Sequence, residues 1–461
     1  MERSNAKLHN SARAEEEPDY PLQGSFLDMP LAAVLRMNDA ERGSYLRKVL
    51  RALHREIRQG TMALKTKVSM KKEMRDLRHL LRAPADKYLY TDERNFRRNV
   101  LGKGAPGFTH TVWSRKFMWQ MVTKQGSLAE QIAKQSPALV NKLMRLLDGK
   151  NAGKQSLRVN TKTALQNILA FMQFDNGVNA AFPPFHARFL ADTFLPQEGD
   201  CLVVDPCAGW GGRLLGTLCV NRTAKVHYFG VDPEKRNKDA YENLLKRVQV
   251  YLKGEVKGLR EAEFSYRPFE DWIISPKAKT MKGAVDLVMT SPPYFSAENY
   301  HTTNAKQSAN RYKTYEQWRE KFYRKLVQGA YDLLKPNGVF VLNIANVTSA
   351  KRLEKDARIL AREVGFENAG FYKLAMSVTP GTRGNERHAV KVDGVIFKHE
   401  PVFCFFRPAK NGAGTRSLIT TPQRSLPTPS RKTVTAPPKP KNTKEALKQV
   451  FRRYKSSRGR K

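Results

Sequence analysis

The chain has 461 residues, of which 82 are lysine or arginine and 43 are aspartate or glutamate, so its formal net charge is +39. This excess favours a polyanionic partner, with nucleic acid ahead of an anionic membrane surface. No run of about 18 apolar residues occurs, so we expect no transmembrane helix, and the first thirty residues lack the apolar core of a signal peptide.

The cysteines also limit the class of protein. They are Cys201, Cys207, Cys219 and Cys404. They show no CxxC pairing and no metal-ligand spacing with histidines, so we expect neither a disulfide framework nor a metal site. We therefore expect an intracellular protein, in the nucleus of a eukaryotic host or in the host cytoplasm for a phage or a bacterium.

The N-terminal part is basic and helical in pattern. Residues 1–30 are polar and partly acidic, which predicts a flexible leader. In residues 31–178, helical periodicity is clearest in "ERGSYLRKVLRALHREIRQG" (41–60) and "KKEMRDLRHLLRA" (71–83). Apolar residues recur there at three- and four-residue spacing, with arginines and lysines on the other faces. A solvated amphipathic helix and a phosphate-contacting helix both fit, so the region is a candidate nucleic-acid-recognition part.

From about residue 180, short apolar runs alternate with helix-like stretches. The runs are "CLVVD" (201–205), "KVHYFGVD" (225–232), "AVDLVMT" (284–290) and "GVFVLNI" (338–344), followed by "GFENAGFYKLAMSV" (365–378) and "HEPVFCFFR" (399–407). Strands alternating with helices predict an α/β fold with a doubly wound, mostly parallel, Rossmann-like sheet over residues 179–407.

Residues 408–461 are rich in proline, threonine, serine and basic residues, which predicts a disordered cationic tail. Such a tail adds sequence-independent affinity for phosphates that weakens steeply with salt.

A glycine-rich turn follows the first predicted strand, in "DPCAGWGGRLLGTL" (205–218). Asp205 ends the strand, and Gly209 and Gly211 belong to the turn before a helix. Glycines let the backbone approach a ligand closely, and open α/β sheets bind ligands at this end of their strands. A tight strand-to-helix turn needs glycine in any case. The acid ahead of the glycines favours a cationic or hydroxyl-bearing ligand over a phosphate, and S-adenosylmethionine, with its ammonium, sulfonium and ribose diol, fits.

Two further acids follow later strands. Asp232 in "GVDPEK" ends the second strand, where ribose hydroxyls are held, although it also suits a helix N-cap ahead of Pro233. In "YRPFEDW", Asp271 could accept a hydrogen bond from an adenine amine, and Glu270 competes for the same role.

The fourth strand ends in Ser291, Pro292, Pro293 and Tyr294, within "DLVMTSPPYFSAENY" (286–300). A Pro-Pro pair ends a central strand and fixes the backbone beyond it, so a rigid turn is one interpretation. The strand should lie beside the first, so this segment would face the glycine turn. Methyl transfer to an exocyclic base amine needs acceptors for the amino protons, which the Ser291 oxygen and the Pro292 carbonyl could supply. Tyr294 offers a flat face for an extruded base.

"TSPPY" with "DPCAGWGGR" upstream resembles the S-adenosylmethionine-dependent amino methyltransferases of DNA, which modify cytosine N4 or adenine N6. The resemblance covers about residues 179–407. It implies S-adenosylmethionine as cofactor and double-stranded DNA with a flipped base as partner. The cofactor-binding residues would be Asp205, Pro206, Gly209, Gly211, Asp232 and Asp271, and the catalytic residues Ser291, Pro292, Pro293 and Tyr294. Serine in the first position favours cytosine N4. Trp210 and Arg213 depart from the family pattern.

Alternatives remain open at this point. An RNA base-amine methyltransferase would use a related site, and a non-catalytic nucleic-acid-binding protein could keep a decayed fold. Outside the motifs, "TPGTRGNERHAVKVDG" (379–394) reads as a polar insertion whose Arg383 and Arg387 could bind substrate. His399 and Glu400 precede the last strand, where an ordinary strand-start role is favoured over catalysis. The sequence does not predict an oligomeric state.

Overall fold

The computed structural model describes residues 29–58, 70–102, 122–123, 126–135, 137–147, 182–221, 223–256, 258–297, 304–378 and 389–409. The chain divides into two compact units, residues 1–419 and 420–461, and every described residue belongs to the first. Most of the expected leader, the expected tail beyond residue 409, and Arg383 and Arg387 lie outside the described residues.

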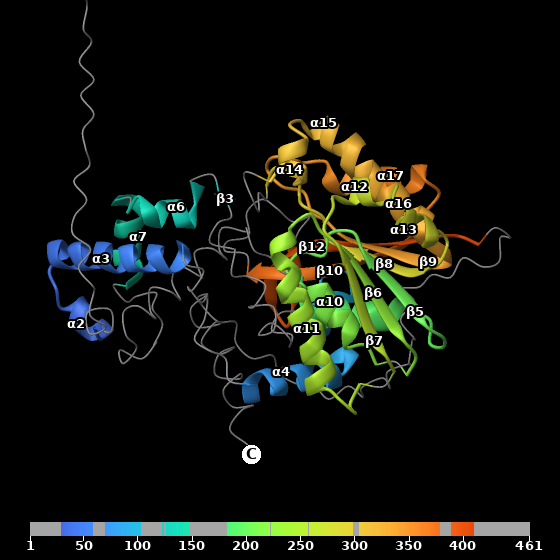
Figure 1. Ribbon diagram of the computed structural model, residues 1–461, viewed down its shortest axis with the longest axis horizontal. Helices are drawn as coiled ribbons and strands as arrows, with labels where there is room; N and C mark the ends of the chain where they lie inside the picture. Colours follow the sequence, from blue (N-terminus) through green and yellow to red (C-terminus); the bar gives the residue numbers. More distant parts are fainter. Residues whose placement is uncertain are drawn as a thin grey trace, which may run out of the picture. The chain divides into compact units, whose positions relative to one another are not determined.

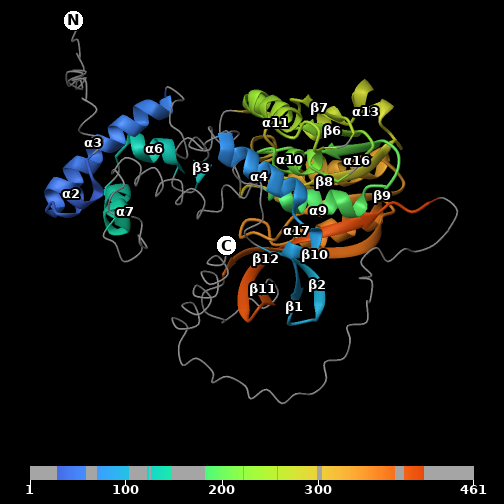
Figure 2. The same cartoon turned by 90° about the horizontal axis from the view of Figure 1, so that it is seen from below.

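The main sheet has ten strands, in the order β1-β2-β10-β12-β9-β8-β5-β6-β7, with β11 paired to β12 (Figure 1; Figure 2). The strands are β1 (Leu89–Asp92), β2 (Arg97–Leu101), β5 (Cys201–Asp205), β6 (Val226–Val231), β7 (Arg260–Ser265), β8 (Val285–Thr290), β9 (Leu334–Asn343), β10 (Glu367–Val378), β11 (Ala389–Val392) and β12 (Val395–Phe406). A separate short pair joins β3 (Val122–Thr123) to β4 (Gly126–Ser127).

The central strands are parallel. β5 pairs with β6 on one side and β8 on the other, and β7 and β9 continue the sheet in the same sense. β12 runs antiparallel to both β9 and β10. The predicted α/β fold with a doubly wound, mostly parallel sheet is confirmed. β5 and β8 lie side by side where the strand order reverses, the position at which such sheets bind ligands.

Alternate residues of the central strands enter two hydrophobic clusters, one on each face of the sheet. In β5, Val203 belongs to one cluster and Val204 to the other, and both are fully buried. In β9, Val341 and Phe340 divide in the same way. Burial on both faces explains why these strands read as continuous apolar runs in the sequence.

Helices cover both faces (Figure 1; Figure 2). One cluster is completed by α4 (Met70–Arg82), α9 (Pro184–Phe194), α10 (Gly212–Leu218) and α11 (Lys238–Tyr251). The other is completed by α12 (Phe269–Trp272), α13 (Pro276–Thr280), α15 (Tyr315–Trp318), the π-helix η4 (Arg319–Tyr323), α16 (Arg324–Leu333) and α17 (Leu353–Glu363). Short helical turns are η1 (Ala85–Tyr88), η3 (Lys235–Asn237) and α14 (Ser308–Arg311).

The N-terminal region differs from the expected purely helical part. β2 pairs in parallel with β10, and β1 pairs with β2, so residues 89–101 extend the sheet itself. In addition, Arg78 and Arg82 of α4 bind Glu255, just after α11, at 2.6 and 2.7 Å. The α/β domain therefore begins before residue 179, because strands from the first hundred residues complete its sheet.

The remaining N-terminal helices are α2 (Leu31–Leu35), α3 (Asp39–Arg58), α6 (Leu128–Ala133) and α7 (Pro137–Leu147). Four apolar residues of α3 are fully buried: Leu46, Val49, Leu50 and Leu53. α6 and α7 both pack against α3. The amphipathic helix expected from the spacing in this segment is confirmed.

The polar stretch 379–394 is only partly as expected. Residues 389–392 form β11, which pairs antiparallel with the start of β12, and residues 379–388 lie outside the described part. In the described part of the chain as a whole, no helix is both long and apolar enough to cross a membrane.

Candidate active site

Two turns meet at one edge of the sheet, because β5 and β8 are parallel neighbours and end there together. β5 ends at Asp205 and leads into the glycine turn, while β8 ends at Thr290 and leads into the Ser-Pro-Pro-Tyr segment, residues 291–294. The Cys207 amide donates a hydrogen bond to Thr290 Oγ1 at 3.1 Å. This bond ties the two turns to each other.

The glycine turn has positions at which residues other than glycine would be strained or would clash. Gly209 and Gly211 have φ values of +57° and +81°, in the left-handed region that favours glycine. A Cβ atom at Gly212 would lie 2.1 Å from the carbonyl oxygen of Phe182, so the backbone packing there requires glycine. The Gly209 carbonyl accepts a hydrogen bond from the Tyr241 hydroxyl at 2.6 Å, which fixes the loop.

Asp205 faces inward, behind this turn. It is fully buried, and it accepts hydrogen bonds from Arg213 Nε at 2.8 Å and from the Tyr228 hydroxyl at 2.7 Å. Arg213 also donates to the Cys207 carbonyl. The Asp205–Arg213 ion pair therefore braces the turn from inside, and Arg213 is one of the residues that depart from the family pattern.

A cavity with an empty volume of about 720 Å³ opens beside the two turns, and we call it the first cavity. Its walls come from residues 206–207, 209–210, 232–234, 236–237, 268–270 and 306–308 and from Ser291, Pro293 and Phe322. Of the residues predicted from the sequence, those that line it are Pro206, Gly209, Asp232, Ser291 and Pro293. The other predicted residues in the described part do not line it: Asp205, Gly211, Asp271, Pro292 and Tyr294.

Asp232 is held at the cavity wall by backbone groups. Its Oδ2 accepts from the Gly209 amide and its Oδ1 from the Glu234 amide, both at 2.8 Å. Burial raises the pKa of the Asp232 carboxyl to about 7, against the lowering effect of these two amide hydrogen bonds. Each oxygen keeps a further lone pair for a ligand hydroxyl.

Glu270, rather than Asp271, reaches the first cavity. The Glu270 side chain is 2% exposed and accepts a hydrogen bond from the Tyr312 hydroxyl at 2.8 Å, and burial raises its pKa. The Asp271 side chain is 49% exposed and pairs with Arg311. Of the two acids that the sequence left open, the geometry brings Glu270 to the cavity wall.

The Ser-Pro-Pro-Tyr segment ends in a tight turn. The Phe295 amide donates to the Pro293 carbonyl at 3.0 Å, which closes a γ-turn centred on Tyr294. Phe295 has a φ of +54°, an uncommon value for a bulky residue, and its buried ring packs against Tyr315 and Trp318. The aromatic packing holds the strained residue in place.

Side chains from the last two central strands hold the segment at both ends. Ser291 Oγ donates to Asn343 Oδ1 at 3.2 Å, and Asn343 Nδ2 donates to the Pro401 carbonyl at 3.1 Å. At the other end, the Tyr294 hydroxyl donates to Glu400 Oε2 at 3.0 Å. The Tyr294 side chain is largely buried in this arrangement.

Sequence reasoning missed several of these residues. Asn343 ends the fifth central strand, and an amide at a strand end beside a predicted site was a usable signal. Glu400 was expected to have an ordinary strand-start role, yet it contacts Tyr294 directly. Phe322 was correctly expected in the core, where it is 3% exposed, but it also lines the first cavity.

Two protein-family models match parts of this chain. The model of the family described as Eco57I restriction-modification methylase matches residues 128–364, more than half of the chain. The model of the family described as DNA methylase matches residues 285–461. The chain belongs to the S-adenosylmethionine-dependent DNA amino methyltransferases.

No curated protein matches this methyltransferase in sequence. Solved structures similar to it include an S-adenosylmethionine-dependent methyltransferase from Methanosarcina mazei, at 11% identity and a TM-score of 0.30 over 48% of this chain and 98% of that one. Another is an S-adenosylmethionine-dependent O-methyltransferase from Thermotoga maritima, at 11% identity and a TM-score of 0.30 over 51% of this chain and 70% of that one.

S-adenosylmethionine is the methyl donor of this methyltransferase. The first cavity has groups that suit such a ligand, because the Asp232 carboxyl and aromatic rings line it, while the carboxylates of Glu234 and Glu270 in its wall pair with Arg236 and Arg311. The rings are those of Trp210, Phe269 and Phe322. Carboxylates attract a sulfonium and an ammonium group, and aromatic faces attract both cations and a purine ring.

Proposed function

We propose that the protein transfers a methyl group from S-adenosylmethionine to an exocyclic amine of a base in DNA, with cytosine N4 favoured over adenine N6. The observation that carries this proposal is the hydrogen-bond direction at Ser291. Asn343 Nδ2 is engaged by the Pro401 carbonyl, so Asn343 turns Oδ1 towards Ser291. The single hydroxyl proton of Ser291 is therefore directed into that bond.

Because its proton is engaged, Ser291 Oγ presents lone pairs and acts as an acceptor towards the first cavity, which it lines. An exocyclic amine is a poor nucleophile while its lone pair is delocalised into the ring. An acceptor that takes a hydrogen bond from the amino group favours the pyramidal form, whose lone pair is available. The Pro292 carbonyl is the second acceptor, since no donor in the described part of the chain engages it.

When bound, S-adenosylmethionine supplies an electrophilic methyl group. The amine nitrogen would gain the methyl group as the methyl–sulfur bond breaks, which leaves S-adenosylhomocysteine, and the amine would give up one proton to water. This overall substitution needs no covalent enzyme intermediate. Tyr294 would stack on the flipped base, as the tetrapeptide of this family implies. Serine in the first position supports cytosine as the target base.

The test uses isotope-labelled S-adenosylmethionine with duplex DNA and, separately, with RNA, followed by nucleoside mass spectrometry. We expect label in N4-methylcytosine from DNA. Label in N6-methyladenine alone would reject the base preference, and label in RNA alone would reject DNA as substrate. Ser291→Ala is the matched variant, and it should lower turnover on the order of a hundredfold with unchanged cofactor affinity, because it removes one acceptor of the transition state.

A further inference from the structure

A second cavity is linked to the Ser-Pro-Pro-Tyr segment through Glu400. It lies between α17, the residues that follow β9, and the paired strands β10 and β12. Ser291 and Pro293 line the first cavity, whereas Glu400, the acceptor of the Tyr294 hydroxyl, lines the second. The hydrogen bond between Tyr294 and Glu400 thus connects the predicted catalytic segment to the second cavity.

The second cavity is strongly basic. Its cationic side chains are Lys351, Arg352, Lys355, Arg358, Lys373 and Lys398. The acids that line it are Glu354 and Glu400, and both accept hydrogen bonds. Glu354 accepts one from the Asn346 backbone amide at 3.0 Å, and Glu400 accepts one from the Tyr294 hydroxyl.

Three of the lysines keep their charge directed to solvent. Lys351, Lys355 and Lys398 are exposed, and none of them forms an ion pair with a carboxylate of the described residues. Lys373 differs, because it is buried and paired with Asp92 at 2.6 Å. The exposed lysines therefore leave an uncompensated positive field at the mouth of the cavity.

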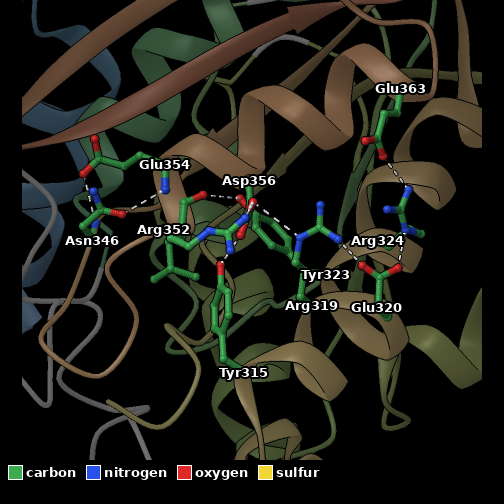
Figure 3. A network of polar contacts seen from close by, with 11 residues as sticks. Tyr315, Arg319, Glu320, Tyr323, Arg324, Asn346, Arg352, Glu354, Asp356 and Glu363 are labelled. Atoms are coloured by element: carbon green, nitrogen blue, oxygen red, sulfur yellow. Dashed lines mark hydrogen bonds and ion pairs between the residues drawn. The ribbon is translucent and has the colours of Figure 1, made fainter.

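A rigid support holds this basic wall (Figure 3). Asp356 of α17 is fully buried and accepts a hydrogen bond from the Tyr315 hydroxyl at 2.6 Å. Arg319, the first residue of the π-helix η4, lies 3.4 Å from the same carboxylate. η4 therefore contributes Phe322 to the wall of the first cavity, and through Arg319 it contacts α17, whose other residues line the second cavity. π-helical turns are uncommon and recur at functional sites.

We propose that the second cavity binds the phosphodiester backbone of the DNA strand that carries the target base. The inference rests on the proposed function, which supplies DNA as the partner. Backbone phosphates position nucleic acid on a protein through lysine and arginine contacts. A strand held in the second cavity would lie close to Glu400 and hence to Tyr294, the residue that Glu400 holds, and its target base could extend from there towards Ser291.

The test compares two double variants of the full chain that remove the same charge. Lys351→Gln/Lys355→Gln removes cations of the second cavity, and Lys246→Gln/Lys253→Gln removes exposed lysines that line neither cavity. Fluorescence anisotropy with a labelled duplex gives the affinity between 50 and 200 mM NaCl. We expect the slope of log K against log salt to fall by about two for the first variant and to stay unchanged for the second.

Equal slopes in the two variants would overturn the proposal. A loss of affinity in Lys351→Gln/Lys355→Gln that appears with a labelled RNA of the same sequence but not with DNA would also overturn it. Cofactor affinity and methyl transfer are measured on the same samples. If the slope changes as expected while no DNA is methylated, the proposed function fails and the binding site stands. If DNA is methylated and the slopes are equal, the proposed function stands and this site is rejected.

Discussion

The Tyr294 hydroxyl donates a hydrogen bond of 3.0 Å to the Glu400 carboxylate, although the two residues are 106 positions apart in the chain. Burial raises the pKa of Glu400, and the hydrogen bond from Tyr294 opposes this shift. The last strand of the sheet therefore orients the last residue of the Ser-Pro-Pro-Tyr segment.

Replacing Glu400 by alanine should lower turnover about tenfold and leave cofactor affinity unchanged. Losing the acceptor of a buried hydroxyl costs about 1–3 kcal/mol, and the released ring is no longer held in one orientation. Glu400→Gln keeps an acceptor oxygen and should retain most of the turnover. The measurements are steady-state kinetics and cofactor titration by calorimetry. Full activity of Glu400→Ala would mean that this bond does not position Tyr294.

Tyr294→Ala should reduce turnover by tenfold to a hundredfold, because stacking of one base on an aromatic ring is worth about 1–3 kcal/mol. Tyr294→Phe keeps the ring and loses the bond to Glu400, so its loss of turnover should be similar to that of Glu400→Ala. In the double variant Tyr294→Phe/Glu400→Ala the losses should not add, since both remove the same interaction. Complete loss of cofactor binding in Tyr294→Ala would assign the ring to the cofactor instead.

Arg213→Met should destabilise the fold by about 3–5 kcal/mol, because it leaves the fully buried Asp205 without its cation. Arg324→Met is the control. Arg324 pairs with Glu320 through side chains that are 37% and 48% exposed, so its loss should cost less than about 1 kcal/mol. Urea unfolding followed by circular dichroism distinguishes the two. Comparable losses of unfolding free energy in the two variants would show that the ion pair between Asp205 and Arg213 does not brace the glycine turn.

Cofactor affinity should rise as the pH increases through about 7, because Asp232, whose pKa lies there, ionises and becomes a better acceptor for ribose hydroxyls. The same group should make the folded protein less stable as pH rises from 3.8 to about 7, since the folded state holds a proton that the unfolded chain releases. Calorimetric titration and thermal unfolding at several pH values test both. Asp232→Asn should flatten both profiles, and an unchanged profile would exclude Asp232 as their source.

The central strands could be predicted because their residues are buried on both faces and follow one another in short apolar runs. β5, β6 and β8 lie within one or two residues of the predicted ranges. β1 and β2 could not be predicted in this way, because "LYTD" and "RRNVL" are short and polar. Their conformation depends on pairing with distant parts of the chain, as the ion pair between Asp92 and Lys373, 281 positions apart, illustrates.

The candidate site was predictable where residue type and strand end coincide, as at Asp232 and Ser291. It was not predictable where a partner decides the direction of a side chain. Asp205 ends its strand, as an acid that faces a ligand would. Its side chain instead lies in the protein interior, where it pairs with Arg213, eight positions later. Arg213 stood out in the sequence as a departure from the family pattern, and its partner explains the departure.

The pairing of β2 with β10 limits how this protein can be shortened. A fragment that begins near residue 179 would keep the glycine turn and the Ser-Pro-Pro-Tyr segment, yet β10 would become an open edge strand, able to pair with the same strand of another molecule. It would also bury Lys373 without Asp92. Aggregation of such a fragment would therefore reflect the missing edge of its sheet rather than a defect in the cofactor site.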